Sequence, residues 1–343
     1  MMQDSPMFPK TAYKPVLFWF SFISMIWCVL LLSFGGITTS LRAGMVFLDW
    51  PLSNGSVNPE GWLQDDHMLA EHGHRLLATG MGILSIVMAI LSFGQKAGAN
   101  LKKMSLWLIA LVVIQGIAGG LRVKLDTLNL DIDHNLYAES FAVLHATLGQ
   151  LTFCFLVAYV IASSKSWIER QAGFEAIPAR SVQVWGLIAV SSIIVQLVIG
   201  AVVRHSHAWS AIMTFPHSHP SGAWIPPAFD FKVAVHFAHR VFAIVVTAAI
   251  ITYAVKVWKD AASKRALNKS AITMVALLIL QIALGAWTVL SVRHPHITTF
   301  HMLNGAFLLA VAWMMTYRSY YFKLSKQKPS AKVAASLTEA IRQ

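Results

Sequence analysis

The sequence predicts an all-α membrane protein with eight transmembrane helices, built as two pseudo-symmetric four-helix bundles. Three observations support this prediction. Among the 343 residues, 56% are hydrophobic and 12% are charged, whereas a soluble chain carries about 25% charged residues. Apolar runs of about 20 residues, the length needed to cross the hydrocarbon core, recur along the chain. The same short motifs also appear in both halves of the sequence.

The apolar runs must form helices in lipid, because each backbone polar group then needs a partner within its own segment. They predict spans at 16–36, 68–93, 104–122, 138–163, 181–204, 232–258, 270–290 and 298–320. The resulting organisation is an N-terminal half over 1–163, a linker over 164–180, a C-terminal half over 181–322 and a basic tail over 323–343. Cys28 and Cys154 each lie within an apolar run, so we expect small buried residues rather than a disulfide.

Lysine and arginine concentrate in alternate connecting segments. The two tails and the segments 94–103, 164–180 and 256–269 hold most of them, and the formal net charge is +12. Basic segments stay on the cytoplasmic side, so both termini are predicted to be cytoplasmic. The positive charge therefore indicates topology and membrane-lipid contact rather than nucleic-acid binding. The first span lacks a small-residue cleavage site and should stay in place, which suits a bacterial inner (cell) membrane.

The two halves share motifs, which predicts that the first four spans repeat as the last four. The second and sixth spans open with His-Arg, at 74–75 and 239–240. The third, fifth and seventh spans each contain Gln-x-x-x-Gly. In the fourth and eighth spans, His145 and His301 are each followed four residues later by glycine. Because four spans separate the repeats, both halves have the same orientation. Small residues near the outer ends of the odd spans either allow close packing or leave room for a flat macrocycle; these are Gly35, Gly36, Gly116, Gly119, Gly120, Gly200 and Gly285.

All 14 histidines fall on the outer side of this topology. His74, His145, His239 and His301 stand out, because each lies one to two turns inside an even span and has a counterpart in the other half. Two histidines at equal depth on neighbouring helices can hold one haem iron from opposite sides. Zinc matches less well, since it takes three or four protein ligands and each half offers two such histidines. A pore-lining or proton-relay role is a further alternative.

Glu71 distinguishes the two halves. It precedes His74 by three residues and shares its helix face, whereas the matching position in the second half is His236. A carboxylate beside one haem only predicts a division of labour, with Glu71 in proton transfer. The simpler interpretation is an ion pair with Arg75 at i+4.

Other outer side chains carry less specific hypotheses. Arginines near the outer ends of the spans either pair with haem propionates or extend to the membrane interface; these are Arg42, Arg75, Arg122, Arg204, Arg240 and Arg293. The 205–231 loop contains two His-x-His pairs, formed by His205, His207, His217 and His219. Copper or zinc could bind there, but a stiff polar loop over the site is the stronger expectation.

Together these motifs resemble the haem A synthase family over residues 16–320. The segment Asp49-Trp50-Pro51-Leu52-x-Asn54-Gly55 is similar to the family's first outer loop, and residues 115–123 are similar to its third helix. The resemblance implies an oxidoreductase that converts a ring methyl of haem O to a formyl group by successive hydroxylations, for cytochrome oxidase biogenesis. It also implies a haem b cofactor held by His239 and His301, a haem O substrate near His74 and His145, and an essential Glu71. Haem O synthase and cytochrome oxidase assembly factors would be partners, and homo-oligomer formation stays open.

The chain departs from the family in its first outer loop. Many bacterial members have a cysteine pair there, and Phe47 and Ser53 occupy those positions in this chain, which excludes thiol-disulfide participation of that loop. Two other functions compete with synthase activity: a di-haem b-type electron carrier, and a haem-delivery assembly protein without catalysis. A carrier usually needs ligands at two depths of the same helix, whereas these four histidines share one depth.

Overall fold

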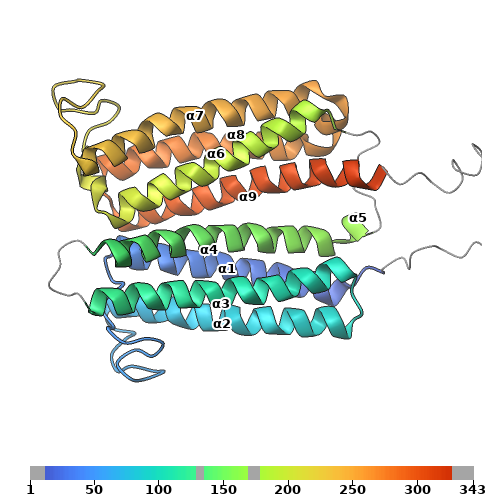
Figure 1. Cartoon of the computed structure of the whole chain (residues 1–343), viewed down its shortest axis with the longest axis horizontal. Coiled ribbons are helices and arrows are strands. Elements are labelled where there is room, and N and C mark those ends of the chain that lie inside the picture. Colours follow the sequence, from blue (N-terminus) through green and yellow to red (C-terminus); the bar gives the residue numbers. More distant parts are fainter. Residues whose placement is uncertain (1–11, 129–134, 169–177, 327–343) are drawn as a thin grey trace, which may run out of the picture.

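The computed structural model describes residues 12–128, 135–168 and 178–326 (Figure 1). Within them lie eight long helices that are apolar enough to cross a membrane, which confirms the eight predicted spans. They are α1 (Pro15–Ser40), α2 (Asp66–Gly94), α3 (Ala99–Thr127), α4 (Leu136–Ser163), α6 (Arg180–His205), α7 (Phe231–Lys259), α8 (Ala261–Leu290) and α9 (Pro295–Lys326). Two short elements, α5 (Lys165–Ile168) and the 3-10 helix η1 (Ala208–Ser210), lie outside the predicted spans.

Polar caps explain why several helices begin before their apolar runs. The Asp65 carboxylate accepts hydrogen bonds from two backbone N–H groups in the first turn of α2, at 2.9 and 2.8 Å. Asn135, Asp230 and Asp260 cap α4, α7 and α8 in the same way. Such caps satisfy amide groups that have no partner within the helix. α1 begins instead with Pro15, which suits the first helical position because it has no N–H to satisfy.

The long helices form two groups of four (Figure 1). α1 and α3 each contact both α2 and α4, and α6 to α9 contact one another in the same cyclic order. The groups meet where α1 packs on α9 and where α4 packs on α6 and α9. α1 begins and α9 ends at one end of the molecule, and the 41–65 and 206–230 loops lie at the other, called the loop end below.

Arginines of the second group hold the C-terminal end of α1 at the loop end. Arg204 Nη2 donates to the Gly36 carbonyl at 2.5 Å and to the Ser40 hydroxyl at 2.7 Å. Arg293 Nη2 donates to the Ser40 carbonyl at 2.7 Å and its guanidinium lies 4.5 Å from the centroid of the Trp209 ring. Carbonyls at a helix C-terminus carry partial negative charge, which a cation stabilises. These bonds join the two groups of helices.

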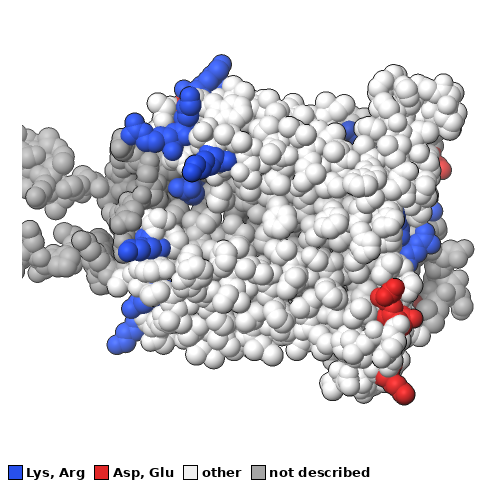
Figure 2. Space-filling model, turned by 180° about the vertical axis from the view of Figure 1, so that it is seen from behind, with Lys and Arg blue, Asp and Glu red and all other residues white. Residues whose placement is uncertain are grey.

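Charge is distributed unequally between the two ends of the molecule. Most of the Lys and Arg atoms in view in Figure 2 lie at the end where α1 begins and α9 ends, and the Asp and Glu atoms in view lie mostly at the loop end. The predicted linker and basic tail fall largely outside the described residues, over 169–177 and 327–343. Cys28 and Cys154 are buried free thiols, as predicted.

Candidate functional site

Four histidines lie near the loop end, each with its ring edge against a glycine of a neighbouring helix. A Cβ built on that glycine would lie only 2.8–3.1 Å from the histidine Cε1. The pairs are His74 on α2 with Gly35 on α1, His145 on α4 with Gly119 on α3, His239 on α7 with Gly200 on α6, and His301 on α9 with Gly285 on α8. These glycines therefore make room for the imidazole rings themselves, a role that the sequence interpretation did not include.

His74 and His145 face each other inside the first group, with ring centroids 6.2 Å apart and ring planes at 90°. His74 Nδ1 lies 3.3 Å from the Leu31 carbonyl oxygen, and His145 Nδ1 lies 3.1 Å from that of Gln115. An Nδ1–H donated to a carbonyl leaves Nε2 available as a metal ligand. Because a metal-bound imidazole nitrogen lies about 2 Å from the metal, rings on opposite sides of one metal have centroids roughly 6 Å apart. The observed spacing fits two imidazoles that would hold one haem iron between them.

In the second group, glutamine amides contact both histidines. Gln196 Nε2 donates to the His239 carbonyl at 2.9 Å and lies 3.2 Å from His239 Nδ1. Gln281 Nε2 lies 3.4 Å from His301 Nε2, and Gln281 Oε1 accepts a hydrogen bond from Asn304 at 2.7 Å. His301 Nδ1 is buried and makes no hydrogen bond within the described part of the chain.

The residues that the structure describes contain no group of three or more His, Cys, Asp or Glu side chains that could hold a metal ion. Within the 205–231 loop, His207 adopts a left-handed conformation with φ of 58°. The His217 ring lies 4.8 Å from the Trp224 ring, and His219 Nδ1 lies 2.8 Å from the Ser221 hydroxyl oxygen. His217 and His219 thus make contacts within their own loop.

Glu71 is buried on α2 at the loop end, with 3% of its surface exposed. Its Oε1 accepts a hydrogen bond from Arg75 Nη2 at 2.6 Å, so the ion pair considered from the sequence is present. Its Oε2 accepts hydrogen bonds from the backbone N–H groups of Val46 and Phe47, at 2.8 and 3.1 Å. The carboxylate therefore joins α2 to the 41–65 loop.

His236 occupies the corresponding place on α7. It is buried, and its Nδ1 lies 3.1 Å from the Ala208 carbonyl oxygen in the loop that follows α6. Glu71 and His236 thus both tie a helix to the loop preceding it, but only Glu71 brings a carboxylate.

Arg75 and Arg240 hold the backbones of the same two loops. Arg75 donates to the carbonyls of Phe47 at 3.1 Å and Asp49 at 2.8 Å, and also to that of Leu52. Arg240 donates to the carbonyls of Ile212 and His217, at 3.1 and 3.2 Å. The two interpretations considered from the sequence, propionate pairing and extension to the membrane interface, both missed these contacts. They join residues that are too far apart in sequence to leave a local pattern.

Phe47 and Ser53 of the 41–65 loop are both buried beside His72. His72 Nδ1 lies 2.9 Å from the Ser53 hydroxyl oxygen, and the His72 ring centroid lies 6.1 Å from that of Phe47 and 4.8 Å from that of Trp62. Packing and a hydrogen bond therefore hold this loop against α2. Sequence reasoning assigned His72 no role, and its position two residues before His74 was the only available signal.

Asp49 organises the tip of the 41–65 loop. Its two carboxylate oxygens accept hydrogen bonds from the backbone N–H groups of Asn54 and Gly55, both at 2.8 Å. Partial burial opposes ionisation of Asp49. The Gly55 and Asn54 amides and the nearby Arg75 charge outweigh that effect, so the pKa of Asp49 lies below its ordinary value.

Asp49→Asn should lower the thermal midpoint by roughly 2–4 °C near neutral pH, the shift expected when about 1 kcal/mol of hydrogen bonding is lost. A carboxyl group with a lowered folded-state pKa stabilises the fold above its unfolded pKa of about 3.9, and this stabilisation is lost as the pH falls through the folded-state pKa. The difference in midpoint between the wild type and the variant should therefore shrink with acid. Fluorescence-detected melting between pH 3 and 7 measures it, with the exposed Glu60→Gln as control. A difference that does not change with pH would contradict the assigned role.

The fold and site define a class: a multi-pass helical membrane protein with histidines placed at one end of both helix groups. Residues 18–313 match the family model described as cytochrome oxidase assembly protein. Similar curated proteins include a haem A synthase of Symbiobacterium thermophilum, 27% identical over 69% of this chain and 73% of that protein. A haem A synthase of an Exiguobacterium species is 23% identical over 90% of this chain and 94% of that protein. One of Brucella anthropi is 26% identical over 73% of this chain and 70% of that protein.

The chain belongs to the haem A synthase family of cytochrome oxidase assembly proteins.

Proposed function

We propose that this protein is a haem A synthase, which oxidises a ring methyl of haem O to a formyl group for cytochrome oxidase biogenesis. The observation that carries the proposal is the facing pair His74 and His145, with the buried Glu71 carboxylate on the same helix as His74. Family membership supports it, because the similar proteins are named haem A synthases. The conversion proceeds by two hydroxylations of the methyl carbon and the loss of water.

The two halves hold different haems in this proposal. In the half over 1–163, His74 and His145 bind the iron of the haem O substrate through their Nε2 atoms, and their Nδ1 contacts with backbone carbonyls support that orientation. In the half over 181–322, His239 and His301 hold haem b. When bound, haem b supplies one-electron transfer away from the substrate.

The two halves form a pseudo-symmetric pair related by an axis along the membrane normal. The four matched histidine–glycine contacts support this relation. A second matched contact lies deeper in each half, where a glycine on the last helix lies against a glutamine amide and a leucine: Gly149 with Gln115 and Leu32, and Gly305 with Gln281 and Leu197. The repetition of both contacts favours an internal duplication.

Glu71 assists as water adds to the methyl carbon, either as the base that takes the water proton or as a negative charge that stabilises a cationic carbon. Each hydroxylation joins one water oxygen to that carbon and releases two electrons and two protons. Burial of the carboxylate strengthens its electrostatic effect. Three hydrogen bonds from the protein use most of the roughly four acceptor positions of the carboxylate and leave one for a substrate water.

We place the loop end on the outer face of a bacterial inner membrane, with both termini in the cytoplasm. The concentration of Lys and Arg at the opposite end supports this orientation (Figure 2). Membrane lipid surrounds the spans, haem O synthase would supply the substrate, and cytochrome oxidase assembly factors would receive the product. A homo-oligomer is compatible with this arrangement.

Mass spectrometry of haems extracted from the purified protein tests the proposed activity, after co-expression with a haem O synthase in a host that lacks haem A. Haem A or its hydroxylated precursor alongside haem B is the expected result. Haem B with unmodified haem O, at full occupancy and with an electron acceptor supplied, would instead support a carrier or delivery protein. A protein that retains no haem would refute the paired-histidine sites.

Gly35→Ala should weaken haem O binding at least tenfold. The new methyl would lie 2.8 Å from His74 Cε1, so the ring must move, and changes around a metal-bound histidine typically cost 10–100-fold in metal affinity. Gly82→Ala on α2 is the matched control, because nothing lies within 4 Å of its added methyl. Absorbance titration of the apoprotein with haem O measures both. Equal affinity in the two variants would argue against ligation by His74.

A further inference from the structure

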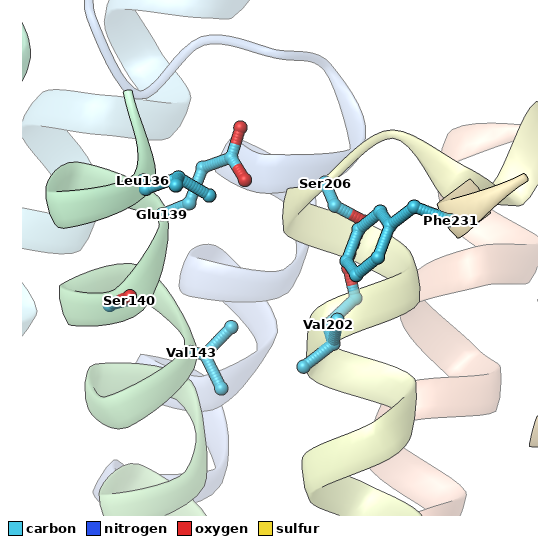
Figure 3. A pocket seen from close by; sticks show the side chains of 7 residues that line it. All are labelled: Leu136, Glu139, Ser140, Val143, Val202, Ser206 and Phe231. Carbon is cyan, nitrogen blue, oxygen red and sulfur yellow. Dashed lines mark hydrogen bonds between the residues drawn. The ribbon is translucent and has the colours of Figure 1, made fainter. Parts of the chain in front are cut away.

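A pocket of about 260 Å³ lies at the loop end between the two groups of helices. α4 contributes Glu139, Ser140 and Val143, and α6 contributes Val202 and Ser206. Figure 3 shows the Glu139 side chain on one wall and the ring of Phe231, the first residue of α7, on the facing wall. The pocket is thus formed by both halves and contains none of the four histidines.

The position of the pocket relates it to both histidine sites. Val143 is two residues before His145 on α4, so the two side chains point to nearly opposite faces of the helix. His145 contacts Gly119 on α3, inside the first group, whereas Val143 lines the pocket. On α6, Val202 lines the pocket two residues after Gly200, which contacts His239. The pocket therefore lies between the two sites, separated from each by one helix, which is about 10 Å thick.

The contact between α1 and α9 is closed at the same end of the molecule. A Cβ on Gly36 would lie 2.6 Å from Met302 and 2.8 Å from Thr299. The hydroxyl oxygens of Ser40 and Thr299 lie 3.1 Å apart. The opening between α4 and α6 is therefore not a general consequence of loose packing between the halves.

The lining combines features that suit a lipid-soluble molecule with a polar head. Leu136 and Phe231 at the rim are 70% and 62% exposed, so the rim is apolar where α4 and α7 begin. The Ser140 and Ser206 hydroxyls and the Glu139 carboxylate lie on the walls. A plain hydrocarbon tail would gain nothing from these groups, because burying polar groups without hydrogen bonds is unfavourable. A head with carbonyl oxygens can accept a hydrogen bond from the Ser140 hydroxyl, whereas the Ser206 hydroxyl donates to the Val202 carbonyl at 2.7 Å.

From this placement and chemistry we infer that the pocket binds the head group of an isoprenoid quinone, the electron acceptor of the proposed haem O oxidation. The inference rests on the proposed function for the source of electrons. Each hydroxylation releases two electrons and two protons, and a quinone that takes up two electrons and two protons becomes a quinol. Glu139 passes protons to the quinone oxygens, and the quinol leaves through the apolar rim into the lipid.

Photolabelling tests the binding site directly. The full-length protein, loaded with haem in lipid nanodiscs, is irradiated with an azidobenzoquinone that carries a decyl chain, and labelled peptides are identified by mass spectrometry. We expect label within 136–146, 199–206 or 231–235, and at least a tenfold loss in Val143→Trp, which fills the pocket. Ser140→Leu serves the same purpose from an exposed position that should not disturb folding. Ile279→Trp, on the 65% exposed surface of α8, is the control and should label like the wild type.

A parallel assay separates this inference from the proposed function. Haem A formation is measured with ferricyanide, a water-soluble acceptor that needs no quinone site. Haem A formation without pocket labelling would overturn the quinone site and leave the synthase proposal intact. Pocket labelling without haem A formation from any acceptor would support the quinone site and refute the synthase proposal. Loss of label on addition of haem O would show that the substrate tail occupies the pocket, which would overturn the inference.

Discussion

Glu71→Gln should reduce haem O oxidation at least a hundredfold, with both haem sites still occupied. The amide oxygen of glutamine can still accept hydrogen bonds from the Val46 and Phe47 backbone, which the carboxylate accepts in the wild type. The variant therefore separates the negative charge from the loop contact. Removal of a general base or charge stabiliser typically costs 10²–10⁴-fold in rate.

The measurement is the yield of haem A and hydroxylated haem per bound haem O over time. Glu60→Gln is the matched control, since it changes an exposed carboxylate in the same loop. Glu71→Ala should lose activity similarly and should also loosen the loop, visible as faster hydrogen exchange in residues 45–53. Normal turnover in Glu71→Gln would show that Glu71 only holds the loop.

His239→Ala should remove haem b and abolish turnover, while haem O still binds in the other half. Loss of a supporting contact alone costs 10–100-fold in metal affinity, so loss of an axial ligand should exceed that range. The reduced absorption spectrum and the extracted haem B per chain measure the effect. His74→Ala should give the reverse result, with haem b retained and haem O binding lost.

The control for both histidine variants is His67→Ala, which removes an exposed histidine from the first turn of α2. It should keep both haems. If His239→Ala lost haem O while retaining haem B, the assignment of the two halves would be reversed.

The fold was predictable from the sequence because membrane spans depend on the length of local apolar runs. The positions of His74, His145, His239 and His301 were predictable because an internal repeat marks them. The contacts of the Glu71 carboxylate with the Val46 and Phe47 amides were not, since they join residues 24 or more positions apart that carry no periodic signal. The inter-group bonds of Arg204 were missed for the same reason, since its acceptors lie more than 160 residues away.

The bonds from Arg204 and Arg293 to the end of α1 also bear on how the chain can be divided. Each half has its own ring of four helices, which suggests that either could be expressed alone. A separated second half, however, would lack the Gly36 and Ser40 acceptors of these guanidinium groups. A hydrogen bond to a charged group typically contributes about 1.5–3 kcal/mol. The two halves should therefore fold as a single cooperative unit, and the two fragments should become soluble and stable in detergent only when they are produced together.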